Sequence, residues 1–283
     1  MSQKPKATPA NQRDSATIAS FGKGLAVIEC FEQSTPRLTI SEVAARTSLE
    51  RATARRFLLT LTKLGYADYD GKHFSLTPRV LRLGYAYLAS TPLPAIVQRV
   101  LEPLSADLDE SASASTLQGH EVVYIARASH RRVMSVGLAV GSRLPAYCSS
   151  MGRVLLGALP AAQLAERLAL APRRRRTKRT LTGLDELIAE IERVRINGYA
   201  VIDQELEEGL VSIGVPVFDA AGKVVAAINC GTQAARIPAS ELPRRVLPRL
   251  LRAQGDLRKM LMGAPDALAG SRRVTAHTGA RMS

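Results

Sequence analysis

The sequence predicts an α+β protein of two domains, and three observations support this prediction. The chain has 283 residues, which is more than one compact domain usually holds. Its first part is typical of helices followed by a hairpin, and its second part of strands mixed with helices. Between the two parts, Ser90-Thr91-Pro92-Leu93-Pro94 interrupts any helix because proline lacks an amide donor.

These boundaries divide the chain into five segments. We expect a disordered arm at 1–17, a winged helix-turn-helix domain at 18–77, a linker helix at 78–92, a second domain at 93–263 and a disordered tail at 264–283.

Charge and composition favour a polyanionic partner but do not locate its site. The formal net charge is +14 and 46% of the residues are hydrophobic, as in an ordinary folded protein. Residues 1–90 carry a net +6, which leaves +8 for the rest of the chain. The most concentrated basic run, Arg173 to Arg179, is bounded by a proline and is expected to be a solvated surface loop.

Several classes of protein are excluded or disfavoured. Cys30, Cys148 and Cys230 are isolated and odd in number, so neither a disulfide framework nor a metal site is expected, and no cofactor is predicted. No apolar run approaches the roughly 20 residues needed to span a bilayer, and no signal sequence follows the polar N-terminus. We therefore expect a cytoplasmic protein that does not act at a membrane.

Three helices are predicted in the first domain. The first covers Gly24 to Gln33, with an apolar face of Leu25, Ala26, Ile28 and Phe31. Thr39-Ile40-Ser41-Glu42 matches a capping box, so a second helix should run from Ile40 to Thr47. After a turn, Arg51 to Leu64 should form a third helix. Its buried stripe is Ala54, Phe57, Leu58, Leu61 and Leu64.

The opposite face of the third helix is polar and cationic, which is what a helix in the major groove requires. That face holds Arg51, Thr53, Arg55, Arg56, Thr60 and Lys63. We expect Arg55 and Arg56 to contact bases or phosphates, and Thr53 to contact a base edge. Arg51 should contact the DNA backbone.

A hairpin should follow this helix directly. Asp70-Gly71 between β-prone residues is a strong hairpin signal, and a hairpin in this place is the wing of a winged helix. Lys72 and His73 at its tip are expected to touch the flanking DNA. Pro78 to Ala89 then predicts a helix that links the domains and pairs with a second copy.

The second domain should be an antiparallel sheet flanked by helices. The expected helices are Ile96 to Ser111, Leu184 to Asn197 and Pro243 to Leu261. The expected strands are Ala112 to Gln118, Glu121 to Ala128, Val133 to Val140, Tyr199 to Asp203, Val211 to Phe218 and Val224 to Gly231.

A pocket is suggested where Tyr147 to Gly152 leads into a helix. Free amides and small hydroxyls at a helix start can hold a carboxylate without a cationic side chain. Arg153 is expected to pack or to form an ion pair, and Arg127 to pair with Glu121.

Two other functions are less consistent with these residues. An enzyme is disfavoured because Gly209 to Gly214 misses the nucleophile-elbow spacing, and no motif supports His73, His120, His130 or His277 as a base for Cys148. A non-specific architectural DNA-binding protein would explain the basic charge. It would leave the second domain without a role.

Four segments resemble the isocitrate lyase regulator (IclR) family. They are Gly24 to Ile28, Leu38 to Gly65, Gly141 to Arg153 and Asp203 to Asp219. Leu61 to Ala67, Ala89 to Leu93 and Leu144 to Gly152 are most similar to the branch that controls aromatic-acid catabolism through the β-ketoadipate pathway.

The resemblance implies a transcription regulator of operator DNA, with a GAF-like effector-binding second domain, working as a homodimer or a dimer of dimers. RNA polymerase is a candidate further partner, and the implied effector is a small carboxylate. The effector positions that the resemblance implies are Leu144, Ser150, Met151, Asp203, Ser212, Asn229 and Gly231.

Overall fold

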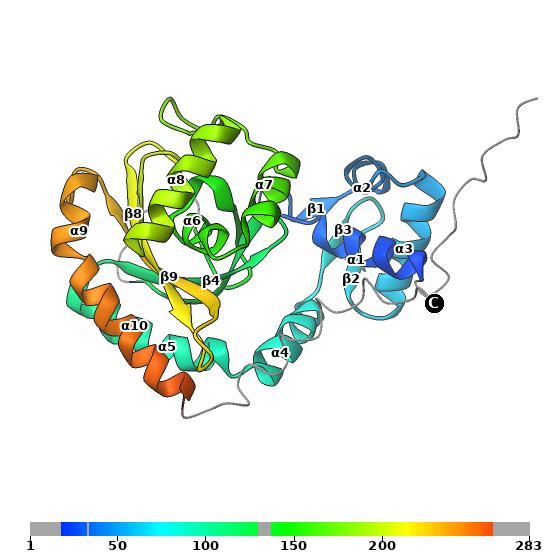
Figure 1. Ribbon diagram of the computed structural model, residues 1–283. Helices are drawn as coiled ribbons and strands as arrows, with labels where there is room; N and C mark the ends of the chain where they lie inside the picture. Colours follow the sequence, from blue (N-terminus) through cyan, green and yellow to red (C-terminus); the bar gives the residue numbers. More distant parts are fainter. Residues whose placement is uncertain (1–17, 33, 130–136, 263–283) are drawn as a thin grey trace, which may run out of the picture. The chain divides into compact units, whose positions relative to one another are not determined.

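The computed structural model describes residues 18–32, 34–129 and 137–262, and it divides into two compact units between Ala86 and Tyr87 (Figure 1). The predicted arm at 1–17 and tail at 264–283 lie outside the described residues.

The N-terminal unit consists of three helices and a small antiparallel sheet of order β1-β3-β2. Its elements are α1 (Ala19–Glu29), β1 (Arg37–Leu38), α2 (Ile40–Thr47), α3 (Arg51–Lys63), β2 (Ala67–Tyr69) and β3 (Phe74–Leu76). The core lies where the three helices meet the sheet, and it includes Val27, Leu38, Val43, Leu58 and Phe74.

Local chemistry explains why α2 and α3 form where the sequence predicts them. The Thr39 hydroxyl accepts a hydrogen bond from the Glu42 amide, and the Glu42 carboxylate accepts one from the Thr39 amide at 2.7 Å, which completes the capping box. Ser48 adopts a positive φ of 54° and ends α2, so that α3 starts three residues later.

The first helix differs from its prediction. It starts and ends earlier, at Ala19–Glu29, and its buried residue is Val27, while Leu25 is 40% exposed. The strand β1 was not predicted, because two residues are too few to show an alternating pattern.

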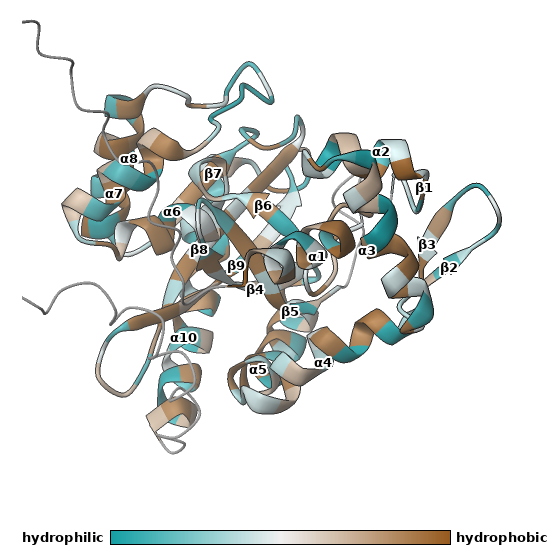
Figure 2. Cartoon of the chain, turned by 90° about the vertical axis from the view of Figure 1, so that its right-hand side faces the viewer, coloured by the Kyte–Doolittle hydropathy of each residue, from teal (hydrophilic) through white to brown (hydrophobic). Residues whose placement is uncertain are grey.

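A one-turn 3₁₀ helix (Pro78–Val80) and α4 (Leu81–Ser90) follow the hairpin. Every residue of α4 is exposed, although Leu81, Leu83, Tyr85, Tyr87 and Leu88 are large and apolar. Figure 2 shows that hydrophobic positions recur along α4.

The C-terminal unit is a six-stranded antiparallel sheet of order β6-β5-β4-β9-β8-β7. The strands are β4 (Ser111–Gln118), β5 (Glu121–Ala128), β6 (Arg143–Pro145), β7 (Ala200–Asp203), β8 (Leu210–Phe218) and β9 (Val224–Gln233). The helices are α5 (Leu93–Leu108), α6 (Ser150–Gly157), α7 (Ala161–Leu170), α8 (Leu184–Asn197), α9 (Leu242–Arg245) and α10 (Leu247–Met262).

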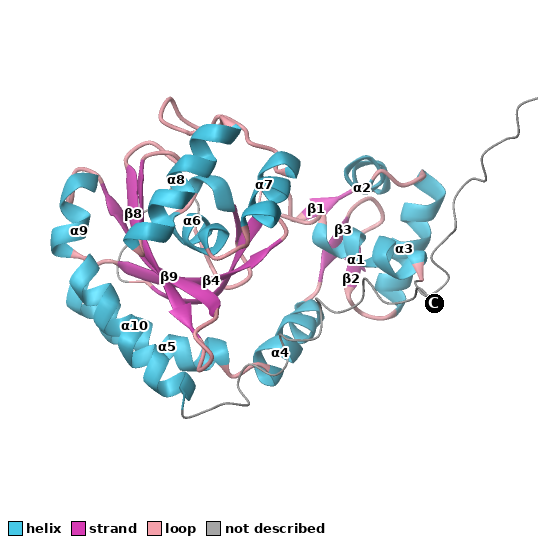
Figure 3. Ribbon diagram, viewed as in Figure 1, coloured by secondary structure: helices cyan, strands magenta, loops and turns pink. Residues whose placement is uncertain are grey.

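Helices cover both faces of this sheet. The core on one face is made with α5, α9 and α10, and the core on the other face with α6, α7 and α8 (Figures 1 and 3). Short 3₁₀ turns at Ala146–Cys148 and Ala239–Glu241 lead into α6 and α9. The α+β prediction is confirmed.

Three predicted elements need correction. The helix predicted to end at Ser111 ends at Leu108, because Asp109 has a φ of 52° and Ser111 starts β4. The predicted strand Val133 to Val140 is absent over its described part, 137–140, and β6 pairs with β5 instead. The predicted final helix is two helices that break at Val246, two residues before Pro248.

Candidate functional site

The outward face of α3 presents the cationic side chains predicted to meet DNA. Arg51, Arg55 and Arg56 are exposed and Thr53 is half-buried. The buried residues Ala54, Leu58 and Leu61 anchor the other face of the helix in the core. The arrangement leaves the cations free to reach a ligand outside the unit.

The hairpin of β2 and β3 is held in shape by its own turn. Asp70 Oδ1 accepts hydrogen bonds from the amides of Lys72 at 2.9 Å and His73 at 2.7 Å, and its carboxylate also pairs with Arg37 on β1. The rings of Tyr69 and Phe74 stack at 4.3 Å across the strands. Lys72 is therefore exposed at the tip, while His73 is half-buried beside Asp70.

A cavity lies in the C-terminal unit between the sheet and the start of α6. Its lining contains hydroxyls, apolar side chains and one arginine, but no carboxylate. The lining residues are Ser111, Ser113, Tyr124, Arg127, Leu138, Leu144, Cys148, Ser149, Ser150, Met151, Ile202, Leu206, Leu210, Ser212, Asn229 and Gly231. Its free volume is about 40 Å³, which is room for a few water molecules.

Arg127 supplies the cationic group in this cavity. Its guanidinium donates hydrogen bonds to Ser113 Oγ at 3.0 Å and Ser111 Oγ at 3.4 Å, whereas its buried Nε has no hydrogen-bond partner within the described chain. Burial lowers the pKa of Arg127, because a charged group is disfavoured away from water. A guanidinium with a buried, unused donor is suited to receiving an anionic oxygen.

The expected pairing of Arg127 with Glu121 does not occur. Glu121 pairs with Arg143 on the neighbouring strand at 2.8 Å. Six residues of extended strand separate Glu121 from Arg127, a span of roughly 20 Å, which no side chain bridges.

Six of the seven expected effector residues line the cavity. They are Leu144, Ser150, Met151, Ser212, Asn229 and Gly231. The seventh, Asp203, lies away from it: its side chain is 42% exposed and pairs with Arg179. Successive residues of a strand face opposite ways, and Ile202 takes the position toward the cavity.

Four further lining residues were not predicted from the sequence: Ser111, Ser113, Tyr124 and Arg127. The alternation Ser111-Ala112-Ser113-Ala114-Ser115 was the available signal, since it places hydroxyls on one face of a strand. The partner strand that brings Arg127 opposite Ser113 could not be known from it.

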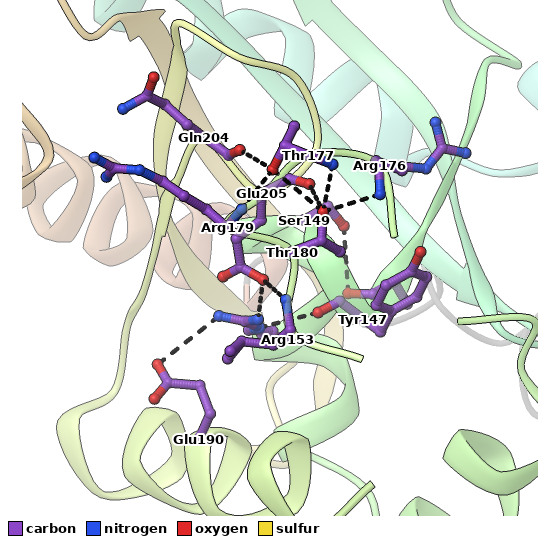
Figure 4. Close-up of polar contacts among 12 residues, drawn as sticks. Tyr147, Ser149, Arg153, Arg176, Thr177, Arg179, Thr180, Glu190, Gln204 and Glu205 are labelled. Atoms are coloured by element: carbon purple, nitrogen blue, oxygen red, sulfur yellow. Dashed lines mark hydrogen bonds and ion pairs between the residues drawn. The ribbon is translucent and has the colours of Figure 1, made fainter. Parts of the chain in front are cut away.

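A buried ion pair, drawn in Figure 4, lies beside the residues that line the cavity. Arg153 Nη2 donates to Glu205 Oε2 at 2.6 Å, and Arg153 Nε donates to the carbonyl of Tyr147 at 3.0 Å, next to the lining residues Cys148 and Ser149. Glu190 lies 3.9 Å from the same guanidinium. The prediction that Arg153 forms an ion pair is confirmed.

The basic loop is tied to this ion pair from the other side. The buried hydroxyls of Thr177 and Thr180 donate to the carbonyls of Gln204 at 2.7 Å and Glu205 at 2.6 Å. Arg174, Arg175 and Arg176 are exposed, as expected for a surface loop. The loop is therefore solvated but fixed in place.

The described residues offer no support for metal or thiol chemistry. No group of three or more His, Cys, Asp or Glu side chains within them could hold a metal ion. Burial raises the pKa of Cys148 to about 11, so its thiol is protonated at neutral pH. His120 is exposed, and His130 and His277 lie outside the described residues. Among the described helices, none combines the length and apolar character needed to cross a membrane.

Family models match both units of the chain. The IclR helix-turn-helix domain matches residues 20–71, and the bacterial transcriptional regulator IclR C-terminal domain matches residues 85–257. The chain belongs to the IclR family. It is a DNA-binding transcription regulator with an effector domain, and the enzyme alternative is set aside because its relatives are named as regulators.

Individual relatives agree with this family. The chain is 49% identical over 247 residues to the Pca regulon regulatory protein of Pseudomonas putida, covering 87% of this chain and 85% of that protein. It is similar to the crystal structure of a putative transcriptional regulator from Rhodococcus, with 48% identity, a TM-score of 0.75, and coverage of 88% and 100% of the two chains.

The chain is also similar to a ligand-bound structure. That structure is the inducer-binding domain of a double mutant of the PobR transcription factor from Acinetobacter, in complex with 3-hydroxybenzoic acid. The identity is 33%, the TM-score is 0.56, and the match covers 59% of this chain and 98% of that one.

Proposed function

We propose that this IclR protein binds one operator through α3 and the wing, and that a small aromatic carboxylate in the cavity of the C-terminal unit controls this binding. The operator and effector would be read by one homo-oligomer in the cytoplasm, as a dimer or a dimer of dimers, with RNA polymerase as a candidate contact at the promoter.

One observation supports a carboxylate effector: the guanidinium of Arg127 lies in a cavity whose lining has no carboxylate. Its unused Nε donor would pair with one carboxylate oxygen, and the hydroxyls of Ser111 and Ser113 hold the guanidinium in place. Apolar side chains such as Leu144, Leu206 and Leu210 would cover an aromatic ring. The relative bound to 3-hydroxybenzoic acid supports the same class.

The cavity's small volume implies that the protein changes conformation when the effector binds. A benzoate ring does not fit in 40 Å³, so effector binding would displace part of the wall. A ligand can shift a conformational equilibrium only through unequal affinity for its two states. Enlarging the cavity would supply that inequality.

The effector is tested by thermal unfolding of the full chain with hydroxybenzoates and related aromatic acids. A ligand that binds the folded state raises the Tm by mass action, and at a hundred times its Kd the added stability is about 2.7 kcal/mol. Arg127→Leu should abolish the rise. Arg143→Leu, which removes an arginine outside the cavity, should retain it.

A rise in Tm that persists in Arg127→Leu would refute the carboxylate role of Arg127. Turnover of the acid instead of binding would revive the enzyme alternative.

The DNA half is tested by titrating operator and random DNA at one salt concentration. A specific regulator should prefer its operator by on the order of 1,000-fold. Arg56→Ala should weaken operator binding by on the order of tenfold or more while circular dichroism and the oligomer stay unchanged. Equal affinity for both DNAs would contradict sequence-specific binding and favour the architectural alternative.

A second copy of the chain would cover the apolar face of α4. Leu81, Tyr85 and Leu88 follow the spacing i, i+4, i+7 and so share one side of the helix, and they are 74%, 69% and 40% exposed. Exposed apolar residues at this spacing are typical of a helix that pairs with another helix.

A further inference from the structure

A hollow lies between α1 and α3 in the N-terminal unit, separate from the effector cavity. Its volume is 250 Å³. Three of its lining residues carry hydroxyls, two carry positive charges, one is aromatic and none is acidic. They are Ser20, Lys23, Thr53, Arg56, Phe57 and Thr60.

The two helices bring these side chains together by their periodicity. Thr53, Phe57 and Thr60 are four and three residues apart and share one side of α3, while Ser20 and Lys23 are three apart on α1. Between the helices, the Phe57 ring lies against Gly24, where an added Cβ would be 3.5 Å from the ring. The hollow therefore has an aromatic wall at a fixed helix contact.

Such a lining is complementary to a phosphate oxygen. Lysine and arginine supply the charge, and hydroxyls supply short-range donors, without a carboxylate to repel the anion. A backbone phosphodiester of DNA is the anion that meets the outward face of a helix-turn-helix.

We propose that this hollow binds one backbone phosphate of the operator, held by Lys23 and Arg56 with hydrogen bonds from Ser20 and Thr53. The inference rests on the proposed DNA-binding function, and it adds α1 to the DNA interface.

Two adjacent arginines on α3 would then make different contacts with DNA. Neighbouring residues on an α-helix are about 100° apart, so Arg55 and Arg56 point to different sides of α3. Arg56 lines the hollow and Arg55 does not. Arg56 is then a phosphate contact that sets position, and Arg55 is left to contact base edges.

The test measures operator and random DNA binding over a range of salt concentrations. Lys23→Ala should lower both affinities by the same factor, on the order of tenfold at low salt. It should also reduce the slope of log affinity against log salt, by at most about 0.9, the value for the loss of one whole phosphate contact. Lys23→Arg should restore both quantities.

Two further variants serve as controls. Arg82→Ala removes one charge from α4, which contributes nothing to the hollow, and should change the slope less than Lys23→Ala does. Arg55→Ala should lower the preference for operator over random DNA. Lys23→Ala should leave that preference unchanged.

An operator with single methylphosphonate substitutions locates the contact. Neutralising the phosphate in the hollow should weaken binding by the wild-type chain more than binding by Lys23→Ala, which keeps only Arg56 as a cation there. Inorganic phosphate is the other source of this anion. If it raises the Tm of the wild type but not of Lys23→Ala, and the salt slopes of the two are equal, the hollow binds free phosphate and the proposal is overturned.

The outcomes separate this inference from the proposed function. If the wild type prefers its operator while Lys23→Ala keeps the affinity and slope of the wild type, the phosphate site is wrong and the regulator stands. A wild type without operator preference contradicts the proposed function itself, and one that binds no DNA removes both.

Discussion

Arg153 is the largest fully buried side chain described in the protein, with 1% of its surface exposed. A guanidinium in that position is tolerated because Glu205 lies 2.6 Å away and the carbonyl of Tyr147 takes a further donor. The pair joins α6 to the turn after β7, so it fixes the main chain of the residues that begin the cavity wall.

We predict that Arg153→Met lowers the free energy of unfolding by about 3–5 kcal/mol, since it leaves the carboxylate of Glu205 buried without its partner. Urea denaturation measures this change. Arg179→Ala is a matched control that breaks an exposed pair with Asp203 and should cost about 1 kcal/mol or less. Equal losses in the free energy of unfolding for the two variants would show that the buried ion pair matters no more to stability than the exposed one.

The three thiols should differ in reactivity, because only thiolate is nucleophilic. Burial raises the pKa of Cys148 to about 11 and of Cys230 to about 12, and it also raises the pKa of the half-buried Cys30. At about pH 8.5, the ordinary thiol value, iodoacetamide should label Cys30 first. Cys148 and Cys230 should be labelled only after unfolding.

The same shifts have a sign for stability. Cys148 and Cys230 ionise more readily in the unfolded chain than in the folded one. Their contribution to the free energy of unfolding is therefore complete below about pH 8.5, and it is lost as the pH rises through their folded-state pKa values. Mass spectrometry of labelled peptides checks the order. Early labelling of Cys148 would mean that the cavity opens to solvent without an effector.

At the scale of elements, α2 depends on its N-terminal cap. Thr39→Ala removes the hydroxyl that accepts from the Glu42 amide, and we predict a loss of about 1 kcal/mol in the free energy of unfolding. Thr39→Ser should keep most of it. No difference between the two variants in thermal or urea unfolding would contradict a stabilising cap.

The cap also predicts a pH dependence. Hydrogen bonds from the Thr39 amide and hydroxyl lower the pKa of Glu42. A lowered carboxyl pKa stabilises the folded state above the unfolded value of about 4.3, and that contribution is lost as the pH falls through the folded value. Thr39→Ala should therefore also flatten the fall in stability below about pH 4.3.

Elements with local signals could be predicted from the sequence, and those set by distant partners could not. The capping box and the apolar stripe placed α2 and α3 within one residue, and Asp70-Gly71 placed the wing. By contrast, β6 follows from pairing with β5, which the sequence does not encode in any single segment. Asp203 differs from the other expected effector residues for the same reason, since strand alternation turns Ile202 toward the cavity.

The effector cavity could be predicted from the sequence only in part. The turn at Tyr147 to Gly152 indicated a helix-start site with small hydroxyls, and Ser150 and Met151 line it. The cation was not foreseen, because Arg127 reaches the cavity only through the register that sets it opposite Ser113. The groups that a charged side chain on a strand contacts depend on how that strand pairs with its neighbour.

At the scale of the whole molecule, we expect α4 to form the interface between copies of the chain. Burying Leu81, Tyr85 and Leu88 against a second copy would recover the free energy that their exposure costs, roughly 25 cal/mol for each Å² removed from water. A charge placed in that face would have to be buried with it, which is far more costly than exposure in a monomer. We therefore predict that Tyr85→Glu converts the assembly to monomers of 30.5 kDa.

Size-exclusion chromatography with light scattering gives the mass directly. Leu251→Glu, at a 46% exposed position on α10, is the control and should leave the assembly intact. Because a palindromic operator is bound by two recognition helices at once, Tyr85→Glu should also weaken operator binding although α3 and the wing are untouched. A Tyr85→Glu chain that keeps the wild-type mass would place the interface elsewhere, and weakened DNA binding at that unchanged mass would assign α4 to coupling between the units rather than to pairing.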